Sequence, residues 1–372
     1  MRLDIRMPGE ADSEERAWRV VRAAFAERER VPVARRRLVP LLAAVGTAAV
    51  LAAVSTGPGR AVVDALREHV GVQRSAPALF SLPAPGRVLV DSVRGSWVVQ
   101  ADGSKRLLDG YHDASWSPHG LFVAAVRGRE LVALEPTGDV HWTLARPRGI
   151  RAPRWSPDGY RIAYLSGGML RVVNGDGTGD RLLAAGAGSA APAWRPTVGH
   201  IVAFAVPDGH VNVWDADART RLASLPARAT ARQLAWSAGG NRLLVRTDEA
   251  IDVYDLSGAR RLRVRGLFGA AAFAPGGGLL AVVQRTDRRS ELLVYDTEHP
   301  RTHAQRVFAA GGELRDVAWS PNGRWLLVGW SDADQWVFVR STGVHRIAAA
   351  ASIRAQFASG TRTFPRIGGW CC

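Results

Sequence analysis

Cysteine is almost absent from this sequence. The chain of 372 residues has two cysteines, Cys371 and Cys372, and both stand at its very end. Two adjacent thiols cannot form a disulfide framework or a zinc site of the CxxC kind. They can remain exposed thiols, pack against the domain, close a strained ring with each other or bridge to a second molecule, and the sequence does not choose among these alternatives.

Lysine is nearly missing as well. Lys105 is the single lysine among the 49 Lys and Arg residues, and the formal net charge is +15. An excess of positive charge suits anionic partners such as nucleic acid, anionic lipid or an envelope polymer. However, the one dense basic run is at 28–37. Arginine spread over a solvated surface therefore explains the composition better, and we expect no nucleic-acid partner.

The usual catalytic motifs are also lacking. The sequence contains no GxSxG elbow, no HExxH motif and no P-loop. The nine histidines are scattered, and the closest spaced pair, His299 and His303, falls in an expected loop, where the two side chains do not share a face. We therefore predict a protein that is not an enzyme and that uses no metal and no cofactor.

Long apolar runs are rare too, with one exception at 38–54. These seventeen uncharged residues follow Arg35, Arg36 and Arg37. A helix of this length covers about 25 Å, the lower end of what spans a bilayer. Basic residues before it place residues 1–37 in the cytoplasm and the rest of the chain outside. We predict a single-pass transmembrane helix at 38–55; a cleaved signal peptide and a buried core helix are the alternatives.

The segment before this run has helical spacing over 12–30. Trp18, Val21 and Phe25 fall on one face of the expected helix. So small a helix cannot bury that face alone, so we expect it to dock on a cytoplasmic partner or lie on the membrane, with a frayed helix as the alternative. Residues 56–86 are predicted to form a juxtamembrane helix and a linker to the domain at 87–372.

That domain repeats one short phrase, an aromatic residue followed by a turn and a β-rich run. The phrase reads "SWSPHGLFVAAV" at 115–126, "PRWSPDGYRIAYL" at 153–165 and "AWSPNGRWLLVGW" at 318–330. In each turn, proline fixes one corner and glycine supplies the positive φ that returns the chain, which predicts a hairpin. The aromatic positions, 37 to 46 residues apart, are Trp116, Trp155, Trp194, Trp236, Phe273 and Trp319.

A second pattern gives a separate count of the repeats. Seven strand ends carry an apolar pair before a turn, from "WVVQADG" (97–103) to "WVFVRSTG" (336–343). Repeats of about 40 residues with several short strands are typical of a β-propeller. We therefore predict an all-β propeller of seven blades, with six or eight as alternatives. A C-terminal strand at 353–360, with Phe357 in the aromatic position, is expected to complete the first blade.

The phrases "RWSPDGYRIAYL" and "AWSPNGRWLLVG" resemble the WD40-like (PD40) repeats of bacterial TolB-type propellers. The resemblance covers about residues 88–360. It implies a propeller that acts as a binding platform in the cell envelope. TolB has six blades and a separate N-terminal domain, for which residues 56–86 leave no room, so the resemblance implies the architecture and not the role of TolB.

Basic residues recur close before the aromatic positions. Where the chain enters the innermost strand of a blade, such side chains would converge at one mouth of the central channel. A focused positive potential attracts anions; pairing with Asp113, Asp316 and water is the structural alternative. The predicted ligand-binding residues are His112, Arg151, Arg232, Arg315 and Arg354.

Three functions are compatible with these patterns. The first is a noncatalytic, membrane-anchored propeller outside the cell membrane that binds a protein, a peptide or an anionic envelope polymer. The second is a transmembrane regulator that resembles anti-sigma factors in layout, although it has no zinc-binding His/Cys motif. The third is a propeller enzyme with carboxylates and histidines over a central metal, against which the basic channel residues argue.

Overall fold

A computed structural model describes residues 72–76, 81–196, 199–227, 229–341, 346–358 and 363–372. The chain divides into residues 1–49 and residues 50–372, and every described residue belongs to the second unit. The predicted helix at 12–30 and transmembrane helix at 38–55 lie outside the described residues. Among the residues that are described, no helix has the length and apolar character needed to span a membrane.

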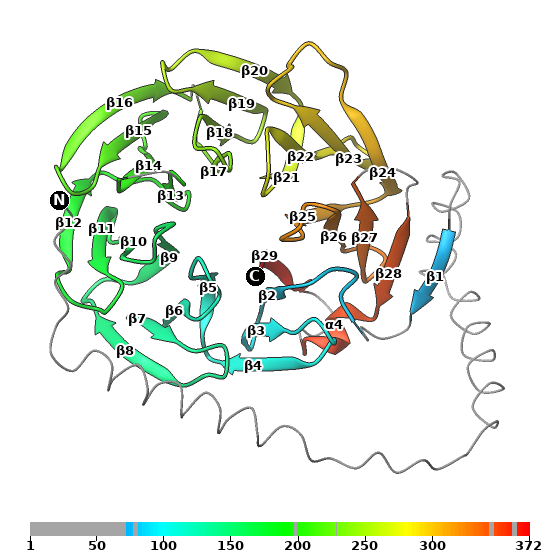
Figure 1. The fold of residues 1–372 in the computed structure, drawn as a ribbon, viewed down its shortest axis with the longest axis horizontal. Coiled ribbons are helices and arrows are strands. Elements are labelled where there is room, and N and C mark those ends of the chain that lie inside the picture. Colours follow the sequence, from blue (N-terminus) through cyan, green and yellow to red (C-terminus); the bar gives the residue numbers. More distant parts are fainter. Residues whose placement is uncertain (1–71, 77–80, 197–198, 228, 342–345, 359–362) are drawn as a thin grey trace, which may run out of the picture. The chain divides into compact units, whose positions relative to one another are not determined.

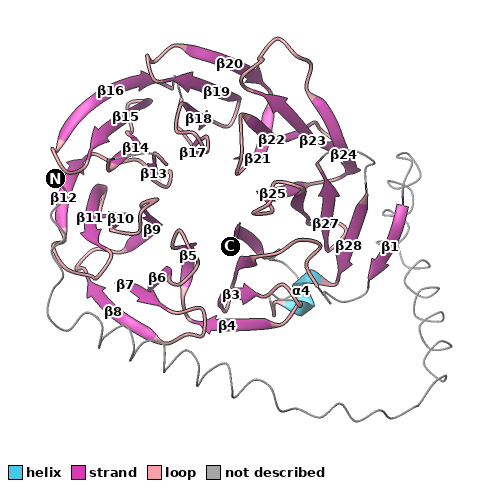
Figure 2. Ribbon diagram, viewed as in Figure 1, coloured by secondary structure: helices cyan, strands magenta, loops and turns pink. Residues whose placement is uncertain are grey.

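The described residues form seven sheets around a central axis (Figures 1 and 2). Six sheets have four strands and one has five, and within each blade the consecutive strands are antiparallel neighbours. The predicted seven-bladed, all-β propeller is therefore confirmed. The first blade contains β2 (Arg87–Ser92), β3 (Gly95–Val99), β4 (Lys105–Asp109) and the C-terminal strand β29 (Arg366–Cys371). The second contains β5 (His112–Trp116), β6 (Val123–Arg127), β7 (Glu130–Leu134) and β8 (Val140–Ala145), and the third contains β9 (Ile150–Trp155), β10 (Arg161–Ser166), β11 (Met169–Asn174) and β12 (Arg181–Ala185).

The fourth blade contains β13 (Ala193–Trp194), β14 (Ile201–Ala205), β15 (His210–Asp215) and β16 (Thr220–Pro226), and the fifth contains β17 (Gln233–Trp236), β18 (Arg242–Arg246), β19 (Ala250–Asp255) and β20 (Arg260–Arg265). The sixth contains β21 (Leu267–Phe273), β22 (Leu279–Arg285), β23 (Arg289–Asp296) and β24 (Gln305–Gly311). The last blade contains β25 (Leu314–Trp319), β26 (Trp325–Trp330), β27 (Gln335–Arg340) and β28 (Ile347–Ala351).

The C-terminal end of the chain completes the first blade, but not with the predicted residues. The closing strand is β29, where Trp370 pairs with Val88 of β2, whereas Ile353–Gln356 forms the short helix α4. The expected strand at 353–360 is therefore wrong. The physical reason is distance, because β27, β26 and β25 separate β28 from the axis, so the residues directly after β28 cannot pair with the innermost part of the first blade.

Phe357 has a different role from the one predicted. It follows α4, is fully buried, and its ring centroid lies 4.9 Å from that of Trp336 and 5.7 Å from that of Trp97. Trp336 belongs to the last blade and Trp97 to the first. Phe357 therefore fills the seam between the two blades, where a large ring buries apolar area that neither sheet covers alone.

In four of the repeated phrases, a buried serine holds the turn that follows the aromatic residue. Gly159 N donates to Ser156 O (2.9 Å), and Arg161 N donates to Ser156 Oγ (2.9 Å). Gly159 has φ +79°, a conformation that side chains with Cβ avoid. The same pair of bonds recurs at Ser117, Ser237 and Ser320. The repeated phrase thus encodes one hairpin geometry.

The hydrophobic core lies between neighbouring blades. One cluster joins Val88 and Val90 of β2 to Leu327 of β26 and Phe338 of β27, all at most 3% exposed. Each sheet is buried on both faces, which is why its middle strands read as nearly continuous apolar runs. The packing of blade on blade fixes the radial positions of the innermost strands.

One strand precedes the propeller. β1 (Val72–Ala76) pairs in parallel with β28 and becomes the fifth strand of the last blade. It falls in the segment 56–86, for which a helix and linker are predicted. The remaining residues of that segment before Ser81 lie outside the described part of the chain. β1 covers the outer edge of β28, the only outer edge among the described strands with such a neighbour.

Candidate functional site

The innermost strands of the blades surround a central cavity of about 600 Å³. Figure 1 shows β5, β9, β13, β17, β21, β25 and β29 around this centre. Residues of six blades and of the segment directly before β13 line the cavity. Its wall has more arginine than carboxylate side chains, and these charged residues are Arg151, Arg154, Arg232, Arg246, Arg366, Asp91, Asp113 and Asp316.

Two of the five predicted ligand-binding residues line this cavity. Arg151 lies in β9, and its Nη2 donates to Gly188 O at 3.4 Å. Arg232 directly precedes β17, and its guanidinium makes a two-pronged contact with Asp248, with Nη2–Oδ2 at 2.8 Å. Both arginines are exposed to solvent.

The other three predicted residues do not line the cavity. His112 Nδ1 is 3.6 Å from Asp91 Oδ1, and Arg315 Nη2 is 2.8 Å from Glu313 Oε2. Arg354 is on α4 rather than at the start of an innermost strand, and its Nη2 donates to Ser331 O at 2.9 Å. The placement of Arg354 differs because α4 occupies the place of the expected strand.

Three arginines of the wall were not predicted. Arg366 stands four residues before Trp370, which is the spacing of the other basic positions, but a prediction that places the closing aromatic at Phe357 leaves Arg366 out. Arg154 directly precedes Trp155, and Arg246 lies in the second strand of its blade. For these two, no repeated sequence signal indicates the channel.

Polar side chains tie each of three innermost strands to the next blade. Asp113 Oδ2 accepts a hydrogen bond from Ala152 N, and Asp316 Oδ2 accepts one from Ile367 N at 3.0 Å. Gln233 bonds both the N–H (3.2 Å) and the carbonyl (2.6 Å) of Ala271. These bonds satisfy backbone groups in the channel wall and hold the wall rigid.

The positive charges of the channel arginines repel one another. Burial lowers the pKa of Arg154; nearby Asp113 opposes this and Arg366 adds to it. Protein surrounds this side chain inside the channel, although 36% of its surface is still reached by water. Burial also lowers the pKa of Arg246, with further lowering from Arg366 and Arg232 and an opposing effect of Asp248. Guanidinium groups that repel one another in this way favour the binding of an anion, because its negative charge offsets the repulsion.

The carboxylates only partly balance this charge. Burial raises the pKa of Asp91, against the hydrogen bond from Ser96 and the field of His112. Arg366 Nη2 lies 3.3 Å from Asp316 Oδ1, yet 75% of the Arg366 side chain remains exposed. Guanidinium groups that face a concave, rigid wall are suited to bind carboxylate, sulfate or phosphate groups.

The described residues give no indication of a metal centre. Within them, no group of three or more His, Cys, Asp or Glu side chains is placed to hold a metal ion. Oδ2 of Asp113 and Oδ2 of Asp316 each accept a hydrogen bond from a backbone N–H group.

Comparison with known proteins gives the fold and no family. No family model matches the chain, and no curated protein matches it. Among solved structures, a chain of the mitotic checkpoint complex is 16% identical, with a TM-score of 0.53, and the match covers 68% of this chain and 80% of that one. Hydrazine synthase of Kuenenia stuttgartiensis is 13% identical, with a TM-score of 0.51 and coverage of 72% and 80%.

A third match is the β-propeller domain of Cps50 (Swd1) from Myceliophteria thermophila. It is 16% identical, with a TM-score of 0.50, and the match covers 64% of this chain and 85% of that domain. One matched protein is named as a synthase and another as part of a checkpoint complex. The structural similarity therefore indicates a shared fold and does not indicate a shared activity. The chain is a seven-bladed β-propeller.

Proposed function

We propose that this propeller is a noncatalytic binding module whose central channel receives an anionic group of a protein, a peptide or an envelope polymer. The observation that supports this is the convergence of five arginines from three blades on one cavity. Three aspartates do not neutralise them. A volume of about 600 Å³ suits a side chain or a sugar acid rather than a folded domain.

The proposal is tested by calorimetric titration of the full-length protein with a blocked hexaglutamate peptide. Replacing both Arg151 and Arg366 with alanine removes two exposed guanidinium groups from the wall. We expect binding to weaken at least about tenfold, since charge-assisted hydrogen bonds are the strong contacts of such a site. Arg315→Ala is the matched control, because Arg315 is paired with Glu313 outside the cavity.

Two results decide the matter. Loss of binding in the double variant, with Arg315→Ala within twofold of the wild type, supports the channel as the site. Equal affinity of the double variant and the wild type for the peptide overturns it.

Attachment to a membrane remains a prediction, because residues 38–55 lie outside the described part of the chain. The sequence supports it through the uncharged run 38–54 and the arginines before it. The N-terminal residue of the mature protein distinguishes an anchor from a cleaved signal: a start near residue 55–60 contradicts the anchor. The alternative role of residues 12–30 in holding a cytoplasmic partner is tested by a pull-down with residues 1–37.

A further inference from the structure

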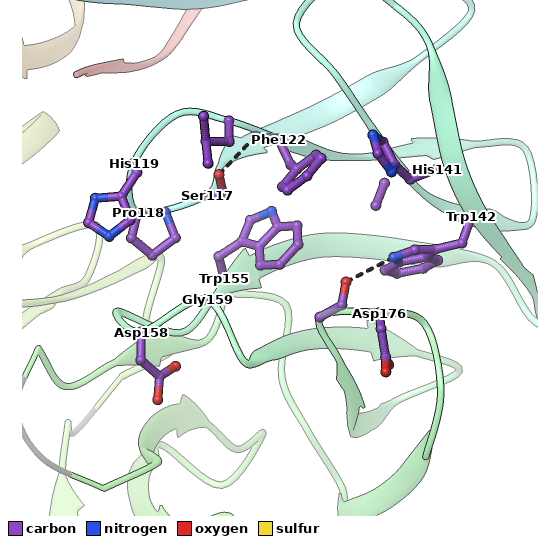
Figure 3. A pocket seen from close by; sticks show the side chains of 13 residues that line it. Ser117, Pro118, His119, Phe122, His141, Trp142, Trp155, Asp158, Gly159 and Asp176 are labelled. Atoms are coloured by element: carbon purple, nitrogen blue, oxygen red, sulfur yellow. Dashed lines mark hydrogen bonds between the residues drawn. The ribbon is translucent and has the colours of Figure 1, made fainter. Parts of the chain in front are cut away.

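A second cavity, of about 570 Å³, lies between the blade β5–β8 and the blade β9–β12. It opens where the turns of the two repeated phrases lie next to each other, and the channel is lined by other residues. Figure 3 shows three large rings in its wall, those of Phe122, Trp142 and Trp155. Nothing in the proposed channel function uses this cavity.

The rings are held in place before any ligand arrives. Trp142 Nε1 donates to Gly175 O at 2.9 Å, and the Phe122 and Trp155 ring centroids are 6.4 Å apart with 23° between their planes. A Cβ atom on Gly177 would lie 2.7 Å from the Trp142 ring, so the turn closes directly on the indole. A rigid aromatic wall lowers the entropy cost of binding.

An exposed apolar side chain borders the aromatic wall. Leu121 lines the cavity and is 64% exposed. Single exposed apolar residues are ordinary, but one that lines an aromatic cavity adds apolar area that a partner can cover.

The cavity carries negative charge in a strongly basic protein. Asp158 and Asp176 line it, and Glu135 Oε1 lies 3.1 Å from Nε2 of the lining residue His141. Hydrogen bonds from Thr178 N and Oγ1 lower the pKa of Asp176. Burial raises the pKa of Asp158, but bonds from Ser156 and Tyr160 and the nearby His200 outweigh it, so its pKa also falls. Both groups are anionic at neutral pH.

We propose that this cavity is the docking site of a partner peptide that inserts an aromatic side chain against Phe122, Trp142 and Trp155. Lys or Arg residues flanking that aromatic residue face Asp158 and Asp176. The choice of a basic partner follows from charge complementarity, because carboxylates border the cavity while the chain as a whole carries +15. An aromatic anchor in a preformed pocket is the usual centre of binding energy in an interface.

The experiment titrates the full-length protein with three blocked peptides, Gly-Arg-Trp-Arg-Gly, Gly-Glu-Trp-Glu-Gly and Gly-Arg-Ala-Arg-Gly. We expect the first to bind with a Kd on the order of 0.1–1 mM, a modest value for one anchor residue. The second and third should each bind at least about tenfold more weakly, because they lack charge complementarity or the anchor.

Matched variants locate the binding on the protein. Asp176→Asn and Leu121→Ser should each weaken the first peptide about fivefold or more. Asp102→Asn is the control for the first, since Ser104 N and Oγ bond Asp102 at 2.9 and 2.7 Å as Thr178 N and Oγ1 bond Asp176 at 2.9 and 2.7 Å. Leu256→Ser is the control for the second, because Leu256 is 54% exposed and does not line the cavity.

Three outcomes would overturn the proposal. The first is equal binding of the Arg-flanked and Glu-flanked peptides. The second is wild-type affinity in both Asp176→Asn and Leu121→Ser. The third is a crosslink from a photoreactive residue at position 121 to residues 1–71 of the same chain, which would make a segment of this protein the occupant. None of these outcomes tests the proposed anion binding in the central channel, which the hexaglutamate titration tests separately.

Discussion

At the scale of single residues, the serine hydroxyl in four of the repeated turns accepts a hydrogen bond from a backbone N–H, as a backbone carbonyl does elsewhere. Ser156 is fully buried, and its Oγ accepts from Arg161 N while contacting Asp158 Oδ1 at 2.6 Å. A buried N–H that loses its acceptor costs far more than an exposed one. The serine of the repeated phrase is therefore structural.

Ser156→Ala should lower the free energy of unfolding by about 1–3 kcal/mol, because Arg161 N is left without its side-chain acceptor. Chemical denaturation with urea measures this directly. Thr220→Ala, at an exposed position on the outer strand β16, is the control and should change stability by less than about 0.5 kcal/mol. A loss for Ser156→Ala no larger than that of the control would contradict a structural role of this hydrogen bond.

A second residue-scale prediction concerns Asp255 and acid. Hydrogen bonds from Ser257, together with those from Arg261 and Ala259, lower the pKa of Asp255 to about 2 despite an opposing effect of burial. A folded-state pKa below the unfolded value of 3.8 stabilises the fold above pH 4, and this contribution is lost as the pH falls toward 2.

Asp255→Asn should therefore destabilise the protein by about 1–2 kcal/mol at pH 7 and by little at pH 2. The measurement is a series of thermal melts of both proteins between these pH values. A difference in stability between wild type and variant that stays constant down to pH 2 contradicts the assignment of a lowered pKa to Asp255.

At the scale of elements, the tryptophans of the repeated phrase join neighbouring blades. Trp194 Nε1 donates to Arg154 O (2.9 Å), Trp236 Nε1 to Ala193 O (3.2 Å) and Trp319 Nε1 to Ala272 O (2.9 Å). In each case the acceptor is the residue just before the aromatic position of the preceding blade. The aromatic positions thus supply both packing volume and a directional bond.

Trp194→Phe should cost more stability than Trp155→Phe, by about 1 kcal/mol. The first substitution removes a donor from Arg154 O, whereas the Trp155 Nε1–H has no hydrogen-bond partner among the described residues. Both substitutions remove similar ring area, so urea midpoints isolate the hydrogen bond. Equal costs would mean that ring volume alone matters at these positions.

The closing strand is the element on which the whole ring depends. Ending the chain after residue 362 removes β29 and leaves the inner edge of β2 and the apolar face of Val88 and Val90 uncovered. We expect loss of cooperative folding and aggregation by size-exclusion chromatography, because an exposed apolar edge invites intermolecular pairing. Replacing Cys371 and Cys372 with serine, which keeps the strand, should leave a folded monomer.

At the scale of the whole molecule, the propeller combines two cavities of opposite character. The channel is lined by arginines from several blades, whereas the cavity between the blades β5–β8 and β9–β12 is aromatic with carboxylates. A basic protein that binds an anion in one place and a basic peptide in another can join two partners.

Raising NaCl from 50 to 500 mM should separate the two sites. Binding of hexaglutamate to the channel should weaken at least about tenfold, since screening acts on each charged contact. Binding of Gly-Arg-Trp-Arg-Gly should weaken by less than about fourfold, because much of its affinity comes from apolar burial. Similar losses for both peptides would argue against the aromatic anchor.

The number of blades and the basic positions of Arg151 and Arg232 follow from spacing in the sequence, because each repeat codes its own turn and strands. The closing strand does not follow in the same way. "RIGGWCC" carries the Arg–Trp spacing but no turn phrase after it. Only the pairing of β29 with β2 in the folded structure distinguishes it from "IRAQFASG", which contains the helix α4.

By itself, the sequence determined what is local and repeated: the aromatic and glycine turns, the repeat of about 40 residues and, through it, the all-β propeller of seven blades. Short-range hydrogen bonds and φ preferences act over a few residues, so they can be read from the chain. Only the tertiary structure decided which side chains meet, such as Arg246 and Arg366 in the channel or Phe122 and Trp142 in the second cavity. These side-chain contacts depend on how neighbouring blades pack against each other. That packing is set by the sum of many weak contacts rather than by any one motif.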